Sequence, residues 1–157
     1  KEVKSHQSIE HDSIVKFYGY FTENEDSYIV MELCKGSLRD YVTPNDPFNT
    51  EKAIQVLRQL VAALEYLHAK NISHRDITAG NVLILRIRDD GYPIVVSSQL
   101  CDFGLAKSMG SMWAKHTVAG TPGYMDPRVV SGQKHGNEVD IYSLGGVLYM
   151  MLTGSEP

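Results

Sequence analysis

The chain has 157 residues, of which 43% are hydrophobic and 22% charged, a composition typical of one globular domain. The net charge of -4 and the sequence pI near 5.8 argue against nucleic acid or an anionic membrane as the main partner. The two cysteines, Cys34 and Cys101, have no CxxC partner. We therefore expect neither a cysteine metal site nor a disulfide framework, and a reducing compartment such as the cytoplasm or nucleus.

The first part of the chain predicts the end of a helix followed by a β-hairpin. Residues 1–9 repeat apolar positions at intervals of three, as the end of a helix does. Two segments rich in Val, Ile, Tyr and Phe come next, and we expect strands at 14–21 and 27–33. The polar residues 23–26 between them predict the turn that joins two antiparallel strands.

Two helices are predicted after the hairpin. Residues 34–38 interrupt the strand pattern, and Ser37 is expected to cap a short helix that ends near Tyr41. A longer helix is predicted over 51–70, after a loop at 43–47. Its cap is expected to be Asn49 or Thr50, and its apolar stripe to comprise Ala53, Leu57, Leu60, Val61, Leu64, Leu67 and His68.

The remaining pattern predicts a second hairpin and a buried helix. Short strands are expected at 82–85 and 94–100, joined by a turn at 89–93. A more apolar helix is expected over 138–152, and its apolar run is much shorter than a membrane span. The residues suited to burial in it are Val139, Leu144, Val147, Leu148 and Met151. A hairpin followed by a mainly helical body predicts an α+β architecture in two lobes.

One motif contains the side chains that are needed to transfer a phosphoryl group from a magnesium-bound nucleotide. It is His-Arg-Asp-Ile-Thr-Ala-Gly-Asn at 74–81, followed about twenty positions later by Asp-Phe-Gly at 102–104. Asp76 is suited to accept the proton of a substrate hydroxyl, while Asn81 and Asp102 offer hard oxygen ligands to magnesium. A polar turn with a capping Asp explains any one of these residues, but it does not explain the whole set at these spacings.

These motifs resemble the signature of eukaryotic protein kinases. The resemblance runs along the whole chain and is strongest to the polo-like kinases, through Glu-Val-Lys-Ser-His-Gln-Ser-Ile at 2–9, Val-Met-Glu-Leu-Cys at 30–34 and Val-Ala-Gly-Thr-Pro-Gly-Tyr at 118–124. It implies a two-lobed kinase-like fold truncated at both ends. Residues 1–33 would be the remainder of the small lobe, and 34–157 the hinge and part of the large lobe.

The resemblance also implies a function. It predicts a serine/threonine kinase that uses ATP and Mg²⁺ on protein substrates, with a role in cell-cycle or centrosome regulation and a cytoplasmic, nuclear or centrosomal location. The 157 residues by themselves are expected to be inactive and poorly soluble, because a helix over 138–152 would expose apolar surface.

The resemblance assigns five residues to the nucleotide. Glu2 would be the helix glutamate that pairs with the ATP-binding lysine, although a solvated helix residue explains it equally well. Met31 would stand beside the adenine, Leu83 would pack beneath the ring, and the backbone of Glu32 and Cys34 would hydrogen-bond its edge. For Met31 and Leu83 a plain core position is compatible with this role, because an adenine pocket is itself apolar.

Residues 102–128 would be the activation segment. Thr117 occupies the position of the activating phosphothreonine, and Arg75 would bind its phosphate through charge-assisted hydrogen bonds; the alternative is an unmodified loop threonine. Thr121 would hydrogen-bond the catalytic Asp76 and resembles the serine/threonine form of this loop. Asp140 would accept hydrogen bonds from the backbone of the 74–81 loop.

Three departures from the family pattern leave alternatives open. Thr78 stands where most serine/threonine kinases carry a lysine, a feature shared with the centriole-duplication branch of the polo-like kinases. Arg128 replaces the glutamate of Ala-Pro-Glu, and the segment between Asn81 and Asp102 is several residues longer than usual. The main alternative is a pseudokinase that acts as an ATP-binding or interaction scaffold. A tyrosine kinase is a weaker one, disfavoured by Thr121 and Pro122.

Overall fold

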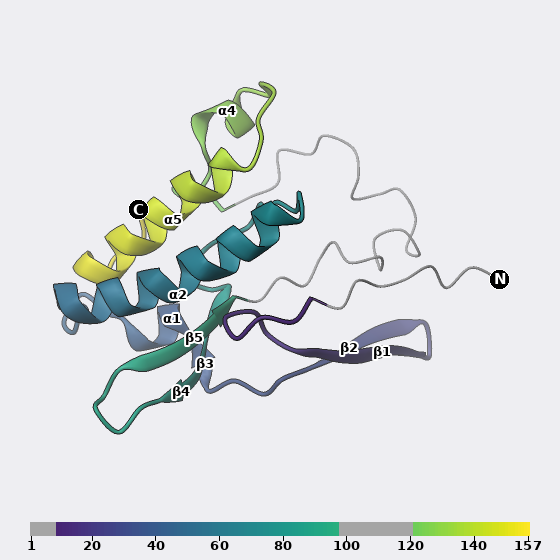
Figure 1. Ribbon diagram of the computed structural model, residues 1–157, viewed down its shortest axis with the longest axis horizontal. Helices are drawn as coiled ribbons and strands as arrows, with labels where there is room; N and C mark the ends of the chain where they lie inside the picture. Colours follow the sequence, from purple (N-terminus) through teal and green to yellow (C-terminus); the bar gives the residue numbers. More distant parts are fainter. Residues whose placement is uncertain (1–8, 98–120) are drawn as a thin grey trace.

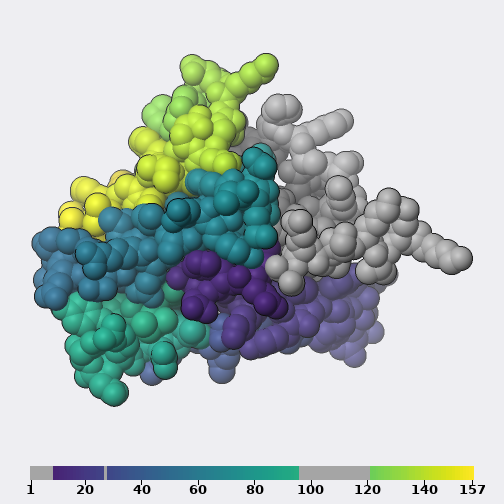
Figure 2. Space-filling model, viewed as in Figure 1, coloured from purple at the N-terminus to yellow at the C-terminus, as the bar shows by residue number. Residues whose placement is uncertain are grey.

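The computed structural model describes residues 9–97 and 121–157. Glu2, Asp102, Thr117 and the expected helix end at 1–8 lie outside the described residues. The hairpin β1–β2 extends to one side of a body in which the long helices α2 and α5 lie next to each other (Figure 1). A three-stranded sheet, in the order β3-β4-β5, covers the other side of α2. Figure 2 shows α5 packed on α2, and α2 on the β4–β5 hairpin.

The first hairpin confirms the predicted turn. Strands β1 (Phe17–Glu23) and β2 (Asp26–Met31) are antiparallel, with Glu23 opposite Asp26. The two turn residues, Asn24 and Glu25, have φ angles of 50° and 72°. Left-handed φ at both positions is the geometry of a type I′ turn, whose twist matches that of the two strands.

The first strand begins three residues later than the expected start at Ile14. Ile14 and Val15 are buried, and Ile14 packs against Ala63 and Leu67 of helix α2. Its backbone N–H donates to the carbonyl of His11 in a turn. The apolar residue Ile14 therefore packs on the helix and does not mark the beginning of the strand.

Ser37 is the last residue of β3 (Gly36–Ser37) and, as expected, directly precedes the short helix α1 (Leu38–Tyr41). The Asp40 carboxylate accepts hydrogen bonds from the Ser37 hydroxyl at 2.7 Å and from the Ser37 N–H at 2.8 Å. These bonds lower the pKa of Asp40. A negative charge in the first turn also suits the positive end of the helix dipole.

Helix α2 (Thr50–Ala69) begins where the sequence predicts, because Asn49 accepts a hydrogen bond from the Lys52 N–H at 2.8 Å. The buried face of the helix differs from the predicted apolar stripe. Val56 is fully buried, whereas Val61 is 45% exposed. The buried residues of the helix are Ala53, Val56, Leu60, Ala63, Leu64 and Leu67.

The second hairpin consists of β4 (Val82–Ile87) and β5 (Pro93–Ser97), close to the predicted strands. The side chain of Gln59 joins it to α2: its Oε1 accepts from the Val95 N–H at 3.0 Å, and its Nε2 donates to the Pro93 carbonyl at 3.2 Å. A polar residue in the predicted helix thus pairs backbone groups of the sheet.

Helices α4 (Pro127–Val130) and α5 (Glu138–Thr153) complete the fold. Helix α5 ends at Gly154, whose φ of 73° is the left-handed C-cap conformation. Its expected core residues are buried except Leu148, which is partly buried. Within the described part of the chain, no helix combines the length and apolar character needed to cross a membrane.

Candidate active site

The 74–81 loop is anchored on a fully buried carboxylate of helix α5. Asp140 Oδ2 accepts a hydrogen bond from the His74 N–H, and Oδ1 accepts one from the Arg75 N–H, each at 2.8 Å. His68 Nε2 at the end of α2 lies 2.8 Å from Asp140 Oδ2. The predicted contact between Asp140 and the loop backbone is confirmed. His68, expected only as part of an apolar stripe, also contacts this carboxylate.

The backbone of the loop is held in an unfavourable conformation. Arg75 has a φ of 66°, in the left-handed region that costs a residue with a Cβ about 1–2 kcal/mol. The charge-assisted bond from its N–H to Asp140 offsets this cost. The side chain of His74 is buried, and this burial lowers its pKa. A neutral imidazole fits the hydrogen bond that Nδ1 accepts from the Asp76 N–H at 3.3 Å.

Asp76 and Asn81 meet at the exposed side of the loop. Asn81 Nδ2 donates to the Asp76 carboxylate at 2.6 Å and to the Asp76 carbonyl at 2.9 Å. Thr78 lies between them in the sequence, and its side chain is buried. Its hydroxyl and carbonyl oxygens lie 3.3 and 3.0 Å from the backbone nitrogen of Asn81. The loop therefore presents a carboxylate and a carboxamide, held together, on a buried backbone.

A cavity of about 480 Å³ brings together four of the residues expected at the adenine. Met31, Glu32 and Cys34 line it from the end of β2 and the segment that follows, and Leu83 lines it from β4. The other lining residues are Ile29, Val30, Leu33, Gly36 and Ser37. Burial, and to a lesser extent the nearby Glu32, raise the pKa of the Cys34 thiol, so this side chain is neutral in the cavity.

Residues 121–124 form a turn in which the Thr121 carbonyl accepts from the Tyr124 N–H at 3.1 Å. Tyr124 is buried, and its carbonyl accepts a hydrogen bond from the Ser143 hydroxyl of α5 at 2.7 Å. The turn carrying Thr121 is thus attached to the helix that also holds the 74–81 loop.

Arg128 has carboxylate partners that sequence reasoning did not identify. Its guanidinium donates to both oxygens of Asp126, at 2.7 and 2.9 Å, and to Glu138 at 3.0 Å. Asp126 also caps helix α4 by accepting from the Arg128 N–H at 2.8 Å. Mainly because of the side-chain bonds from Arg128, the pKa of Asp126 falls to about 2. The only sequence signal for this cluster is an Asp two residues before Arg128.

Residues 1–157 match the family model described as protein kinase domain. The chain belongs to this protein kinase family. The predicted membership, and the mixed helix and sheet fold expected from it, are therefore confirmed.

Among relatives of this kinase domain, the probable serine/threonine-protein kinase zyg-1 of Caenorhabditis briggsae is 45% identical over the whole chain. The serine/threonine-protein kinases PLK4 of Drosophila ananassae and PLK2 of Mus musculus are 37% and 36% identical over the whole chain. The predicted similarity to polo-like kinases is confirmed. The chain spans 20% to 22% of the length of these relatives.

A solved structure supports the kinase fold. The crystal structure of Rad53 1-466 in complex with AMP-PNP matches 97% of this kinase domain and 36% of its own chain, with 30% identity and a TM-score of 0.70.

Residues 9–97 and 121–157 contain no group of three His, Cys, Asp or Glu side chains placed to hold a metal ion. The expected magnesium ligands of the kinase domain are the carboxamide of Asn81, which is not one of these side chains, and the carboxylate of Asp102, which lies outside the described residues. Carboxamide and carboxylate oxygens are hard donors of the kind that magnesium prefers, so the chemistry of this pair fits the ion.

Proposed function

We propose that the full-length protein containing this domain transfers the γ-phosphate of ATP to serine and threonine hydroxyls of protein substrates. The observation that carries the proposal is the Asp76–Asn81 pair, which the 74–81 loop presents at the surface while Asp140 binds the loop backbone from below. An exposed carboxylate with a fixed position can accept the hydroxyl proton and orient the attacking oxygen.

The residues of the loop have separate roles in this proposal. Asp76 accepts the proton, and Asn81 with Asp102 would hold magnesium, which would supply positive charge to neutralise the transferred phosphate. Thr78 supports Asn81 through the oxygens that face its N–H. Arg75, whose side chain is exposed, binds the phosphate on Thr117. The Thr121 hydroxyl bonds Asp76 and orients it.

The cavity at the end of β2 is the proposed adenine site. Its apolar lining suits a flat ring: Met31 borders the ring and Leu83 packs beneath it. The backbone at Glu32 and Cys34 hydrogen-bonds the adenine edge. Glu2 is proposed to pair with the lysine that binds the ATP phosphates.

This assignment divides the chain into a small-lobe part at 1–33 and a hinge and large-lobe part at 34–157. By its similarity to PLK4 and zyg-1, we infer that the protein acts in cell-cycle or centrosome regulation, in the cytoplasm, nucleus or centrosome.

The test uses the full-length protein with γ-labelled ATP and casein. We expect label on serine or threonine after acid hydrolysis, and a fall of at least about 100-fold in Asp76→Asn, because a general base contributes about 10²–10⁴ in rate. Asp12→Asn is the matched control, since Asp12 is an exposed carboxylate outside the site. No transfer by a folded protein that carries Thr117→Glu would refute the proposed function.

A further inference from the structure

Glu156 lies just beyond the left-handed cap of helix α5, in a stretch that turns back along the helix (Figure 1). Each of its carboxylate oxygens has its own partner. The Arg39 guanidinium donates to Oε1 at 2.5 Å, and the Tyr124 hydroxyl donates to Oε2. These partners lie 117 and 32 residues away in the sequence, so one carboxylate joins three separate segments of the chain.

The Arg39 partner reaches the loop that carries Asp76 and Asn81. The backbone N–H of Arg39, in the first turn of α1, donates to the Ala79 carbonyl at 3.2 Å. Its guanidinium lies beside Gly80, because a Cβ on Gly80 would be 3.5 Å from the guanidinium carbon. Arg39 therefore contacts the loop through its backbone at Ala79 and through its side chain at Gly80, two residues and one residue before Asn81.

The Tyr124 partner fixes the turn that carries Thr121. The Tyr124 ring packs so closely on Gly146 of α5 that a Cβ there would lie 2.8 Å from a ring carbon. Burial, together with the bond to Glu156, raises the pKa of the phenol, so the hydroxyl stays protonated and remains a donor. The backbone N–H of Tyr124 closes the turn onto Thr121.

We propose that Glu156 is a positioning residue that fixes the 121–124 turn relative to the 74–81 loop through Tyr124 and Arg39. The proposal rests on the proposed function, in which Thr121 orients Asp76. If Glu156 sets the distance between these two segments, its loss leaves each segment folded but misplaced relative to the other. Small misplacements of this kind lower catalytic rates strongly, by up to about 100-fold per 1 Å.

Hydrogen exchange of the full-length protein tests the bridge without an activity assay. We expect Glu156→Ala to raise exchange at the Arg39 and Tyr124 amides, whereas Tyr124→Phe, which removes one of the two bonds, raises it at Tyr124 and not at Arg39. Glu65→Ala is the control, because Glu65 is exposed on α2. Exchange in Glu156→Ala equal to that in the control would refute the bridge.

Kinetics test whether the bridge positions the site. We expect Glu156→Ala to lower kcat/KM for the protein substrate about tenfold with KM for ATP within about twofold of wild type. The exchanged pair Arg39→Glu with Glu156→Arg restores the ion pair and should recover most of this loss. An unchanged kcat/KM, or equal losses in the single and exchanged variants, would overturn the positioning role. A wild-type protein without transfer would refute the proposed function, while the exchange data would still decide the bridge.

Discussion

Arg128 stands where the family pattern has a glutamate, and the structure shows what the arginine contacts. Its partners, Asp126 and Glu138, lie two and ten residues away, so the ion pairs join the 121–128 segment to the start of α5. Asp126 is buried and Arg128 is about 40% exposed. The positive charge of Arg128 is therefore paired with two nearby carboxylates.

This cluster predicts a change in acid stability. The folded-state pKa of Asp126 is lowered from 3.8 to about 2, so its contribution is present above about pH 3.8 and is lost as the pH falls through about 2. Arg128→Gln removes the largest cause of the shift. We therefore expect this variant to have a lower Tm at pH 5, and a smaller further loss than wild type between pH 4 and 2.

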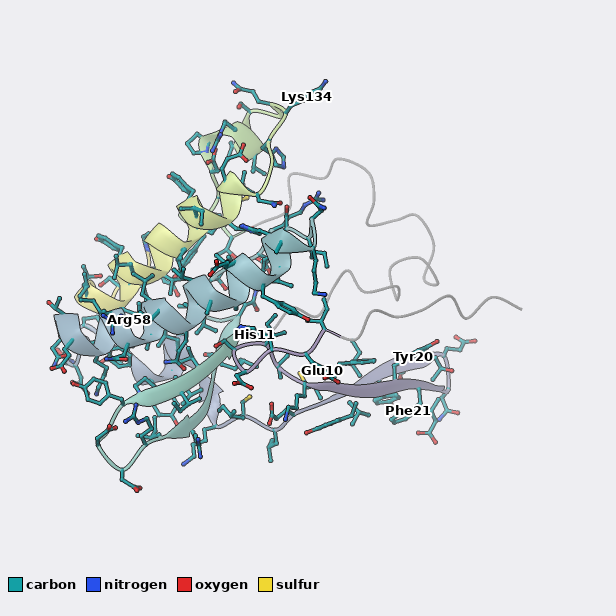
Figure 3. The ribbon with its side chains drawn as sticks, viewed as in Figure 1. Glu10, His11, Tyr20, Phe21, Arg58 and Lys134 are labelled. Carbon is teal, nitrogen blue, oxygen red and sulfur yellow. The ribbon has the colours of Figure 1, made fainter. Side chains whose placement is uncertain are left out.

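Thermal melts at several pH values check this expectation, with Arg58→Gln as the control. Figure 3 places Arg58 on α2, away from the segment that carries Arg128. Parallel Tm curves for wild type and Arg128→Gln across this pH range would contradict the assignment.

At the residue scale, the sequence predicted the groups that stand in a contiguous motif. Asp76 and Asn81 belong to one loop. The family resemblance predicted that Asp140 binds the backbone of that loop. The partners of Arg128 and Glu156 were not predicted, because they depend on how distant segments pack. No local pattern indicates that Glu156 meets Arg39, 117 residues earlier.

At the scale of elements, the side-chain amide of Gln59 on α2 hydrogen-bonds two backbone groups of β5. Gln59→Leu would leave the N–H of the fully buried Val95 without its acceptor and the Pro93 carbonyl without this donor. An unpaired buried polar group costs about 1–3 kcal/mol, so we expect the free energy of unfolding to fall by about that amount.

Urea unfolding of the full-length protein measures this effect. Gln55→Leu, one turn earlier on the same helix, is the matched control, because the Gln55 side chain takes no part in the link to β5. Equal midpoints for the two variants would show that the Gln59 link does not stabilise the fold.

Element boundaries were predicted well where the signal is local. Asn49 was expected to cap α2 and does so, because capping depends on a few neighbouring residues. The four-residue helix α4 was not predicted, although the equally short α1 was predicted from its cap, Ser37. The predicted start of β1 was wrong because the buried Ile14 packs against α2. An apolar residue packed on a helix and an apolar residue in a strand give the same sequence pattern.

At the scale of the whole molecule, the β1–β2 hairpin and helix α5 both carry exposed apolar side chains among the described residues. Tyr20 and Phe21 project from the β1–β2 hairpin and are 54% and 50% exposed (Figure 3). On helix α5, Ile141 and Tyr149 are 55% and 50% exposed. Surfaces of this kind favour association in water.

We therefore expect the 157-residue chain, made by itself, to associate at micromolar concentration. Placing lysines on the α5 surface, as Ile141→Lys with Tyr149→Lys, should shift sedimentation towards the monomer. Glu65→Lys on α2 is the control for a change of charge alone. A monodisperse wild-type chain, or an equal shift in the control, would contradict this role for the α5 surface.

The anchoring of the 74–81 loop on Asp140 has a consequence for biosynthesis. The two backbone bonds span 66 and 65 residues, so the loop cannot acquire its final conformation until α5 has been made and has packed against α2. A chain emerging from the ribosome carries the loop long before its anchor, and such long-range contacts form late. We therefore expect the 74–81 loop of the nascent kinase domain to lack its final conformation while residues 82–140 are being translated.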